Sequence, residues 1–190
     1  MRYLDTSGQA KDQGLATPQE DVEAWLAAQG WQVGAVVPAL ASAAARQMAQ
    51  AMVEQAASDA AALPEAEFAQ ALAEIGPDPM QLAARFGADV LAVFRRIALR
   101  ADSRVGLVCC DASGTLTLRK PVAGFVLPRF GAACPLWPLF SALAHAMTPV
   151  ECVVEAAGQP PARFRVRAFC QPRFPGGFRG PELREAAMLI

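Results

Sequence analysis

Apolar positions in the first hundred residues recur at helical spacing, and prolines and glycines interrupt them at intervals that suit separate helices. The run at 17–20 is a helix start, with a threonine cap, a proline at the first helical position and a glutamate that completes a capping box. A long alanine-rich helix is expected over about 36–63 and a third helix over 65–75, separated by Pro64. Alanine at this density favours a helical hairpin or a dimerisation surface, with an ordinary buried helix as the alternative.

A helix-turn-helix pattern occupies residues 79–98, with a turn at Gly87 and apolar spacing in its second helix. A second helix of this kind can enter the major groove of DNA. Arg95 and Arg96 are then its candidate DNA-binding residues. Any two short helices joined at a glycine give the same pattern, so simple packing of this helix inside the protein is the alternative.

After residue 100 the apolar period changes from helical to two, which is typical of strands. The pattern predicts two hairpins, one from the strands 105–110 and 115–120 and the other from the strands 152–155 and 163–169. It also predicts a third short strand over 125–127, a helix over 135–147 and an apolar C-terminal edge strand over 186–190. The fold class is therefore α+β, a helical N-terminal half followed by an antiparallel sheet with flanking helices, for which a GAF-like arrangement is one candidate. We expect a linker over 1–16, a helical dimerisation or signal-transmitting domain over 17–100, and an α+β ligand-sensing domain over 101–190.

Charge is divided unevenly along the chain, although the net charge is only −1. Residues 1–84 hold 11 acidic and 3 basic side chains, whereas residues 85–190 hold 7 acidic and 14 basic ones, 13 of them arginine. Arginine suits phosphate and carboxylate partners, so the basic half fits an anionic ligand or a nucleic acid. The alternative is that it docks on the acidic half of the same chain or of a partner subunit.

The chain shows no sign of export or of a membrane segment. No apolar run reaches the roughly 18 residues that a spanning helix needs, and the first residues lack the apolar core of a signal peptide. The five cysteines are scattered, without a CxxC pair, which argues against disulfides and a four-thiolate zinc site. These features predict a cytoplasmic protein without a metal site.

Residues that would carry catalysis are scarce. There is a single histidine, His145, and the chain has no HExxH, P-loop, GxGxxG or GxSxG motif. Cys134 precedes a proline at a predicted helix start, where the helix dipole lowers a thiol pKa, but no base is placed nearby by the sequence. We therefore expect a protein that is not an enzyme.

The stretch 124–138 combines three prolines, two glycines and three aromatic side chains within fifteen residues. Such backbone follows a specific path, either around a ligand or at a buried corner between a strand and a helix. A basic rim around an apolar pocket would suit a phosphate head with a short acyl tail. The candidate ligand-binding residues drawn from this reasoning are the basic Arg119, Lys120 and Arg129, and the aromatic Phe125, Phe130 and Trp137.

The same stretch carries a family resemblance. The runs 111–114 (Asp-Ala-Ser-Gly), 119–120 (Arg-Lys), 124–125 (Gly-Phe) and 128–137 (Pro-Arg-Phe-Gly-Ala-Ala-Cys-Pro-Leu-Trp) resemble the C-terminal domain of the short-chain fatty acyl transcriptional regulators. The run 82–87 also matches a segment that this family places just before that domain. The resemblance covers residues 78–190 well and residues 1–77 more loosely.

The resemblance implies an effector-sensing domain of an Xre-type bacterial regulator, with short-chain acyl-coenzyme A as the type of effector. We expect a homodimer, and the resemblance implies that DNA is bound by a domain outside this chain. Arg119, Lys120, Arg129, Cys134 and Trp137 stand at the matching motif positions. Some relatives end in a cysteine cluster that holds an iron–sulfur centre, but residues 173–190 contain no cysteine, so no cofactor is expected. The alternative function is a structural dimerisation or interaction module without a small-molecule ligand.

Overall fold

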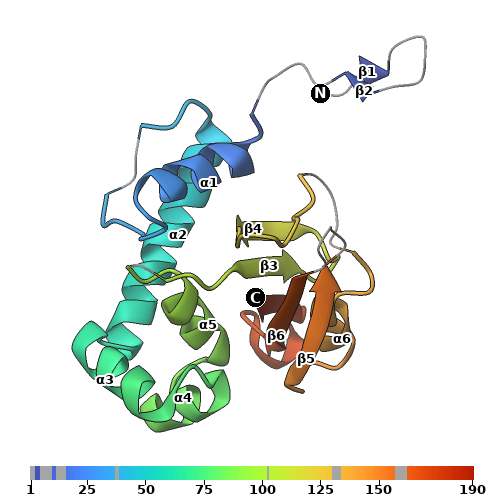
Figure 1. Cartoon of the computed structure of the whole chain (residues 1–190). Helices are drawn as coiled ribbons and strands as arrows, with labels where there is room; N and C mark the ends of the chain where they lie inside the picture. The colour runs from blue at the N-terminus through green and yellow to red at the C-terminus, as the bar shows by residue number, and fades with distance from the viewer. Residues whose placement is uncertain are drawn as a thin grey trace.

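The computed structural model spans the chain and describes residues 3–4, 10–11, 16–36, 39–101, 103–129, 134–156 and 162–190. Five helices come first and the sheet follows (Figure 1). The helices are α1 (Pro18–Ala28), α2 (Ala43–Ala62), α3 (Glu65–Ile75), α4 (Pro79–Phe86), α5 (Val90–Ala98) and α6 (Pro138–Ala144). The strands are β1 (Tyr3–Leu4), β2 (Ala10–Lys11), β3 (Leu107–Asp111), β4 (Leu116–Lys120), β5 (Val150–Ala156), β6 (Ala162–Arg173) and β7 (Leu183–Leu189), with a 3₁₀ turn, η1, at Gly177–Arg179.

Five antiparallel strands form one sheet in the order β4-β3-β7-β6-β5. The predicted α+β class, with a helical N-terminal half, an antiparallel sheet and flanking helices, is confirmed. Both predicted hairpins are present, as β3–β4 and β5–β6. The expected linker over 1–16 contains a two-residue strand pair, β1–β2.

The position of the last strand was predicted wrongly. Residues 186–190 were expected to add an edge strand, but β7 lies at the centre of the sheet, between β3 and β6. Its residues 186–189 are buried without alternation. A continuous apolar run of this kind is the pattern of a strand covered on both faces, since alternation is expected only where one face meets water.

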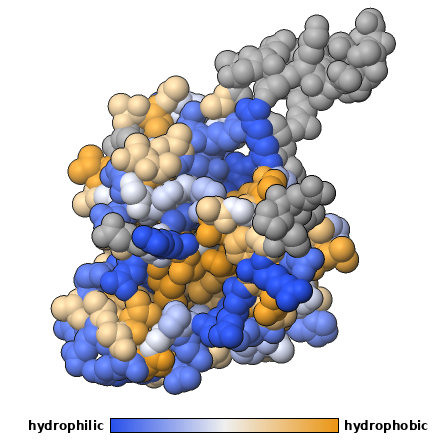
Figure 2. Space-filling model, in the orientation of Figure 1, coloured by the Kyte–Doolittle hydropathy of each residue, from blue (hydrophilic) through white to orange (hydrophobic). Residues whose placement is uncertain are grey.

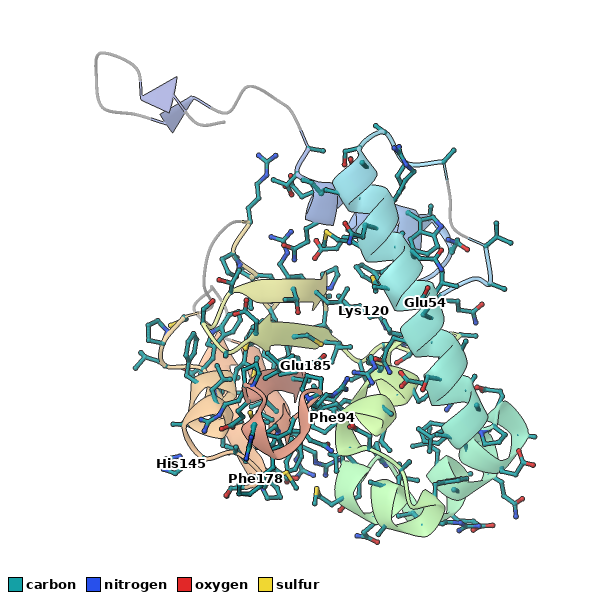
Figure 3. The ribbon with its side chains drawn as sticks, turned by 180° about the vertical axis from the view of Figure 1, so that it is seen from behind. Glu54, Phe94, Lys120, His145, Phe178 and Glu185 are labelled. Atoms are coloured by element: carbon teal, nitrogen blue, oxygen red, sulfur yellow. The ribbon has the colours of Figure 1, made fainter. Side chains whose placement is uncertain are left out.

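Helices cover both faces of the sheet. On one face, α5 packs on β3, β6 and β7, and on the other, α6 packs on β5, β6 and β7. Adjacent residues of β3 divide between the two resulting cores: Cys109 belongs to the α5 side and Cys110 to the α6 side. Figure 3 shows Phe94 of α5 and Glu185 of β7 where helix and sheet meet. Figure 2 shows apolar surface gathered between the helical half and the sheet, with hydrophilic side chains beside it.

The helix starts were predicted correctly at α1 and too early at α2 and α6. The capping box of α1 is present, with Thr17 and Glu20 exchanging hydrogen bonds. The long helix was expected over 36–63 but begins at Ala43, because Ser42 caps it. The helix expected over 135–147 is α6, which has a proline at its first turn and ends before His145.

The third strand expected at 125–127 does not form. Phe125 makes only an isolated bridge to Val122, across a turn in which Gly124 has a φ of 83°. Pro128 follows and has no N–H to donate to a neighbouring strand. The segment between β4 and α6 is therefore irregular up to residue 129, where its described part ends.

Candidate functional site

The first candidate site lies where α1 meets the edge strand β4. An edge strand has a row of backbone N–H groups without strand partners, and proteins commonly cover such an edge. Here the Glu23 carboxylate accepts a 2.9 Å hydrogen bond from the backbone N of Arg119. The Arg119 guanidinium also donates to Glu23, with an Nη2 to Oε2 distance of 2.8 Å, and both side chains are largely buried. One carboxylate thus fixes α1 against both the backbone and the side chain of β4.

Arg119 also orders the segment that follows β4. Its Nη1 donates to the carbonyl oxygens of Pro128, at 3.0 Å, and of Arg129. Since one guanidinium holds Glu23 on one side and two carbonyls on the other, it joins α1 to residues 128–129. A planar group with five donors is suited to such a position.

A second ion pair lies beside the first. Arg129 Nε donates to Glu20 Oε1 at 2.7 Å, and half of the Arg129 side chain is exposed. The hydrogen bond from Arg129 lowers the pKa of Glu20 to about 2, and the backbone N–H of Thr17 adds to this effect. Glu20 and Glu23 are three residues apart, so they share one face of α1. That face therefore presents two carboxylates to two arginines.

These residues border a solvent-open hollow of about 340 Å³. Its walls combine the two ion pairs with small and apolar side chains, and Trp31 contributes an aromatic ring. The lining residues are Glu20, Glu23, Ala24, Ala27, Trp31, Arg119, Pro121, Leu127, Pro128 and Arg129. We call this hollow the α1–β4 site.

Lys120, another predicted ligand-binding residue, lies away from the α1–β4 site. Lys120 is buried on the α5 side of the sheet, and its ammonium donates to the carbonyl oxygens of Ala98, at 2.6 Å, and Ser103, at 2.8 Å. Burial lowers its pKa. Figure 3 shows Lys120 beside the long helix α2. This side chain ties the segment after α5 to β4.

The aromatic part of the prediction forms a cluster on the α6 side. The ring of Phe125 lies 5.3 Å from the rings of both Trp137 and Phe164, centroid to centroid. Cys134 is exposed, and its carbonyl oxygen accepts a hydrogen bond from the Trp137 N–H. Phe130 lies outside the described residues. Of the seven predicted ligand-binding residues, the structure therefore brings Arg119 and Arg129 together in one open site.

The proposed DNA-binding arginines have partners inside the protein. Arg95 pairs with the buried Asp59 through two hydrogen bonds of 2.7 and 3.0 Å. Arg96 pairs with Glu65 at 2.6 Å. The helix-turn-helix geometry is present, with Gly87 in the left-handed conformation, but seven of the nine residues of α5 are buried. These contacts favour the packing alternative for this helix over insertion into DNA.

The uneven charge along the chain has a structural explanation. Each of five ion pairs joins an acid before residue 85 to an arginine at or after it: Glu20–Arg129, Glu23–Arg119, Asp59–Arg95, Glu65–Arg96 and Glu74–Arg85. The basic part of the chain thus docks on the acidic part of the same chain. Glu20 and Glu23 were not among the predicted site residues, although charge complementarity between the halves pointed to contacts of this kind.

Replacing Glu20 by glutamine is expected to lower stability at neutral pH and to have little effect near pH 2. The folded-state pKa of Glu20, about 2, lies below its reference value of 4.5, so its carboxylate contributes stability above pH 4.5 and loses it as the pH falls toward 2. Glutamine can keep the capping-box hydrogen bond to Thr17, so the difference reports on the ion pair with Arg129. Urea unfolding of both proteins at about pH 3, 5 and 7 measures it. A stability gap that stays constant down to pH 3 would contradict the assignment.

Comparison with known proteins gives two informative relatives, while no protein-family profile matches the chain. The chain is 41% identical over 83 residues to the "Propionyl-CoA carboxylase regulator" of Cereibacter sphaeroides. This alignment covers 41% of this chain and 18% of that protein. The structure of this chain matches a solved "Mycobacterium tuberculosis transcriptional regulator" with a TM-score of 0.63 and 26% sequence identity. The match covers 78% of this chain and 46% of the solved chain. The chain has a transcriptional-regulator fold.

The chain spans about a fifth of the length of the curated relative and about half of the solved one. Both relatives are named as regulators, which accords with the expectation that the protein is not an enzyme. Within the part of the chain that the structure describes, no helix is both long and apolar enough to cross a membrane.

Proposed function

We propose that this chain is the effector-sensing region of a bacterial transcriptional regulator of the short-chain fatty acyl type, which binds a small anionic metabolite such as a short-chain acyl-coenzyme A. The observation that carries the proposal is the meeting of Arg119 and Arg129 at the open α1–β4 site. The likeness to two regulators supports the class of function. In this proposal the protein is a cytoplasmic homodimer, uses no cofactor, and binds DNA through an Xre-type domain outside this chain.

The two arginines of the site would have different roles. Arg119 is largely buried and holds backbone carbonyls as well as Glu23, so it maintains the shape of the site. Arg129 is half exposed, and its Nε pairs with the Glu20 carboxylate. A phosphate group can replace a carboxylate on an arginine fork. Binding would then separate Glu20 from Arg129 and loosen α1 from the sheet.

A change at α1 can reach the rest of the helical half. The buried faces of α1 and α2 pack together through Val22, Leu26, Ala45 and Ala49, so a shift of α1 alters the support of the long helix. A ligand shifts the balance between two conformations of a protein only if it binds one of them better than the other. In this proposal the two conformations differ in the contact of α1 with the sheet, and the packing of α1 on α2 passes that difference to the helical half.

Calorimetric titration with acetyl-, propionyl- and butyryl-coenzyme A tests the proposal. We expect saturable binding of at least one thioester, and Arg129→Ala is expected to weaken it about tenfold or more, because a charge-assisted hydrogen bond is lost. Arg163→Ala is the matched control, since Arg163 lies on β6 and is exposed. Absence of binding by every thioester would refute acyl-coenzyme A sensing, and unchanged affinity of Arg129→Ala would refute the site.

A second candidate, an interaction module, is favoured by two exposed apolar side chains. Val126 and Leu136 are 80% and 90% exposed. Exposed apolar side chains that gather into a contiguous patch mark contacts with another protein. Light scattering over a range of concentrations tests this candidate: a dimer that Leu136→Ser dissociates would support it, and a monomer at all concentrations would count against self-association.

A further inference from the structure

A second and larger groove, of about 580 Å³, lies between α2, α5 and the segment that follows α1. Helices α2 and α5 lie side by side there (Figure 1). The groove shares no lining residue with the α1–β4 site. Its described lining consists of Gln32, Val33, Gly34, Ala35, Val53, Ala56, Ala57, Asp59, Ala60, Glu65, Arg95, Arg96, Leu99, Arg100 and Ala101.

Most of this lining is apolar and small. Three alanines of α2, at positions 56, 57 and 60, form one wall together with Val53. Leu99 and Val33 contribute larger apolar side chains. A volume of this size falls within the range of small-molecule sites, which are typically apolar with a few polar groups that fix orientation. The wall therefore suits an apolar chain rather than a fully polar ligand.

Charged side chains also line the groove. Three arginines and two acids are among its described lining residues. Arg95 and Asp59 neutralise each other through a two-point ion pair, and Arg96 reaches Glu65 through Nη2. Arg100 is partly buried, and its side chain makes no ion pair or hydrogen bond with any described residue. Among the described lining residues, Arg100 is therefore the arginine without an acidic partner.

The Arg96 side chain is already engaged. Its guanidinium lies over the Phe68 ring, 5.8 Å from the centroid, and its Nη2 pairs with Glu65. Its Nε is buried from solvent and has no hydrogen-bond acceptor among the described residues. Arg100 is therefore the arginine of the groove that is available to a ligand.

We propose that this groove binds a monocarboxylate that carries an apolar chain. The Arg100 guanidinium, which has no ion-pair or hydrogen-bond partner among the described residues, calls for a single negative charge on the ligand. The apolar chain lies along the alanine wall of α2. This site is additional to the proposed effector site and does not depend on it.

Calorimetric titration with octanoate tests the proposal, with octan-1-ol and butyrate as comparison probes. We expect one saturable site for octanoate, and weaker binding of octan-1-ol, which lacks the charge, and of butyrate, which lacks most of the chain. Arg100→Gln is expected to weaken octanoate binding about tenfold or more. Arg104→Gln is the matched control, because Arg104 is an exposed arginine outside the groove and its replacement is expected to leave affinity unchanged.

A second variant tests the apolar wall. Ala57 lies on the exposed side of α2 and lines the groove, so Ala57→Phe is expected to obstruct the groove without disturbing the core and to abolish binding. Circular dichroism confirms that each variant is folded. No octanoate binding to the wild type, or an equal loss in Arg100→Gln and Arg104→Gln, would overturn the proposal. So would a concentration-dependent dimer that Ala57→Phe dissociates, because the groove would then be a subunit contact.

Discussion

Replacing Asp59 by alanine is expected to destabilise the protein by about 3–5 kcal/mol, the cost of leaving a buried charge without its partner. Asp59 is 4% exposed, and its carboxylate accepts two hydrogen bonds from Arg95 and a third from Gln55. The Arg95 side chain is 11% exposed, and Glu185 is its other neighbouring acid, at 3.5 Å. Without Asp59, the guanidinium loses its two-point partner and keeps only the longer contact with Glu185.

Urea unfolding of Asp59→Ala measures this effect, and Glu54→Ala is its control. Glu54 lies on the same helix but is exposed, as Figure 3 indicates, and surface substitutions usually change stability by less than about 0.5 kcal/mol. The double variant Asp59→Ala with Arg95→Met is expected to recover part of the loss, because it removes the unpaired charge as well. Equal stability of Asp59→Ala and Glu54→Ala would show that the pair is not needed.

Replacing Phe94 by alanine is expected to cost a similar amount, about 3–5 kcal/mol, through the cavity that the lost ring leaves. Phe94 is 2% exposed and belongs to the core that joins the helical half to the sheet. Phe178→Ala is the same chemical change at a fully exposed position in η1, and it is expected to have little effect. Thermal or urea unfolding of both variants compares them. A comparable loss in both would contradict the assignment of Phe94 to the core.

The elements of this fold were largely predictable because their signals are local. The capping box at 17–20, the glycine turn at Gly87 and the two hairpins depend on residues close in sequence. The start of α2 was missed because alanine continues the helical pattern on both sides of Ser42. The place of β7 was missed because a short apolar run does not by itself state which strands flank it.

The candidate site was less predictable, for a physical reason. Arg119 and Lys120 are adjacent in sequence, yet adjacent strand residues point to opposite faces, and their partners lie on different elements. The carboxylates that meet the arginines come from α1, about a hundred residues earlier in the chain. The sequence showed that the two halves carry opposite charge, but only the packing of α1 on β4 shows which residues meet.

The central position of β7 also bears on how the chain acquires its structure during synthesis. The β3–β4 and β5–β6 hairpins each consist of neighbouring segments and can form as soon as they are made, whereas β7 follows all four of their strands. Until it arrives, β3 and β6 both present open edges that another chain could pair with. The nascent protein therefore passes through a stage in which the inner edges of β3 and β6 are both unpaired, a stage in which chaperones would be of most use.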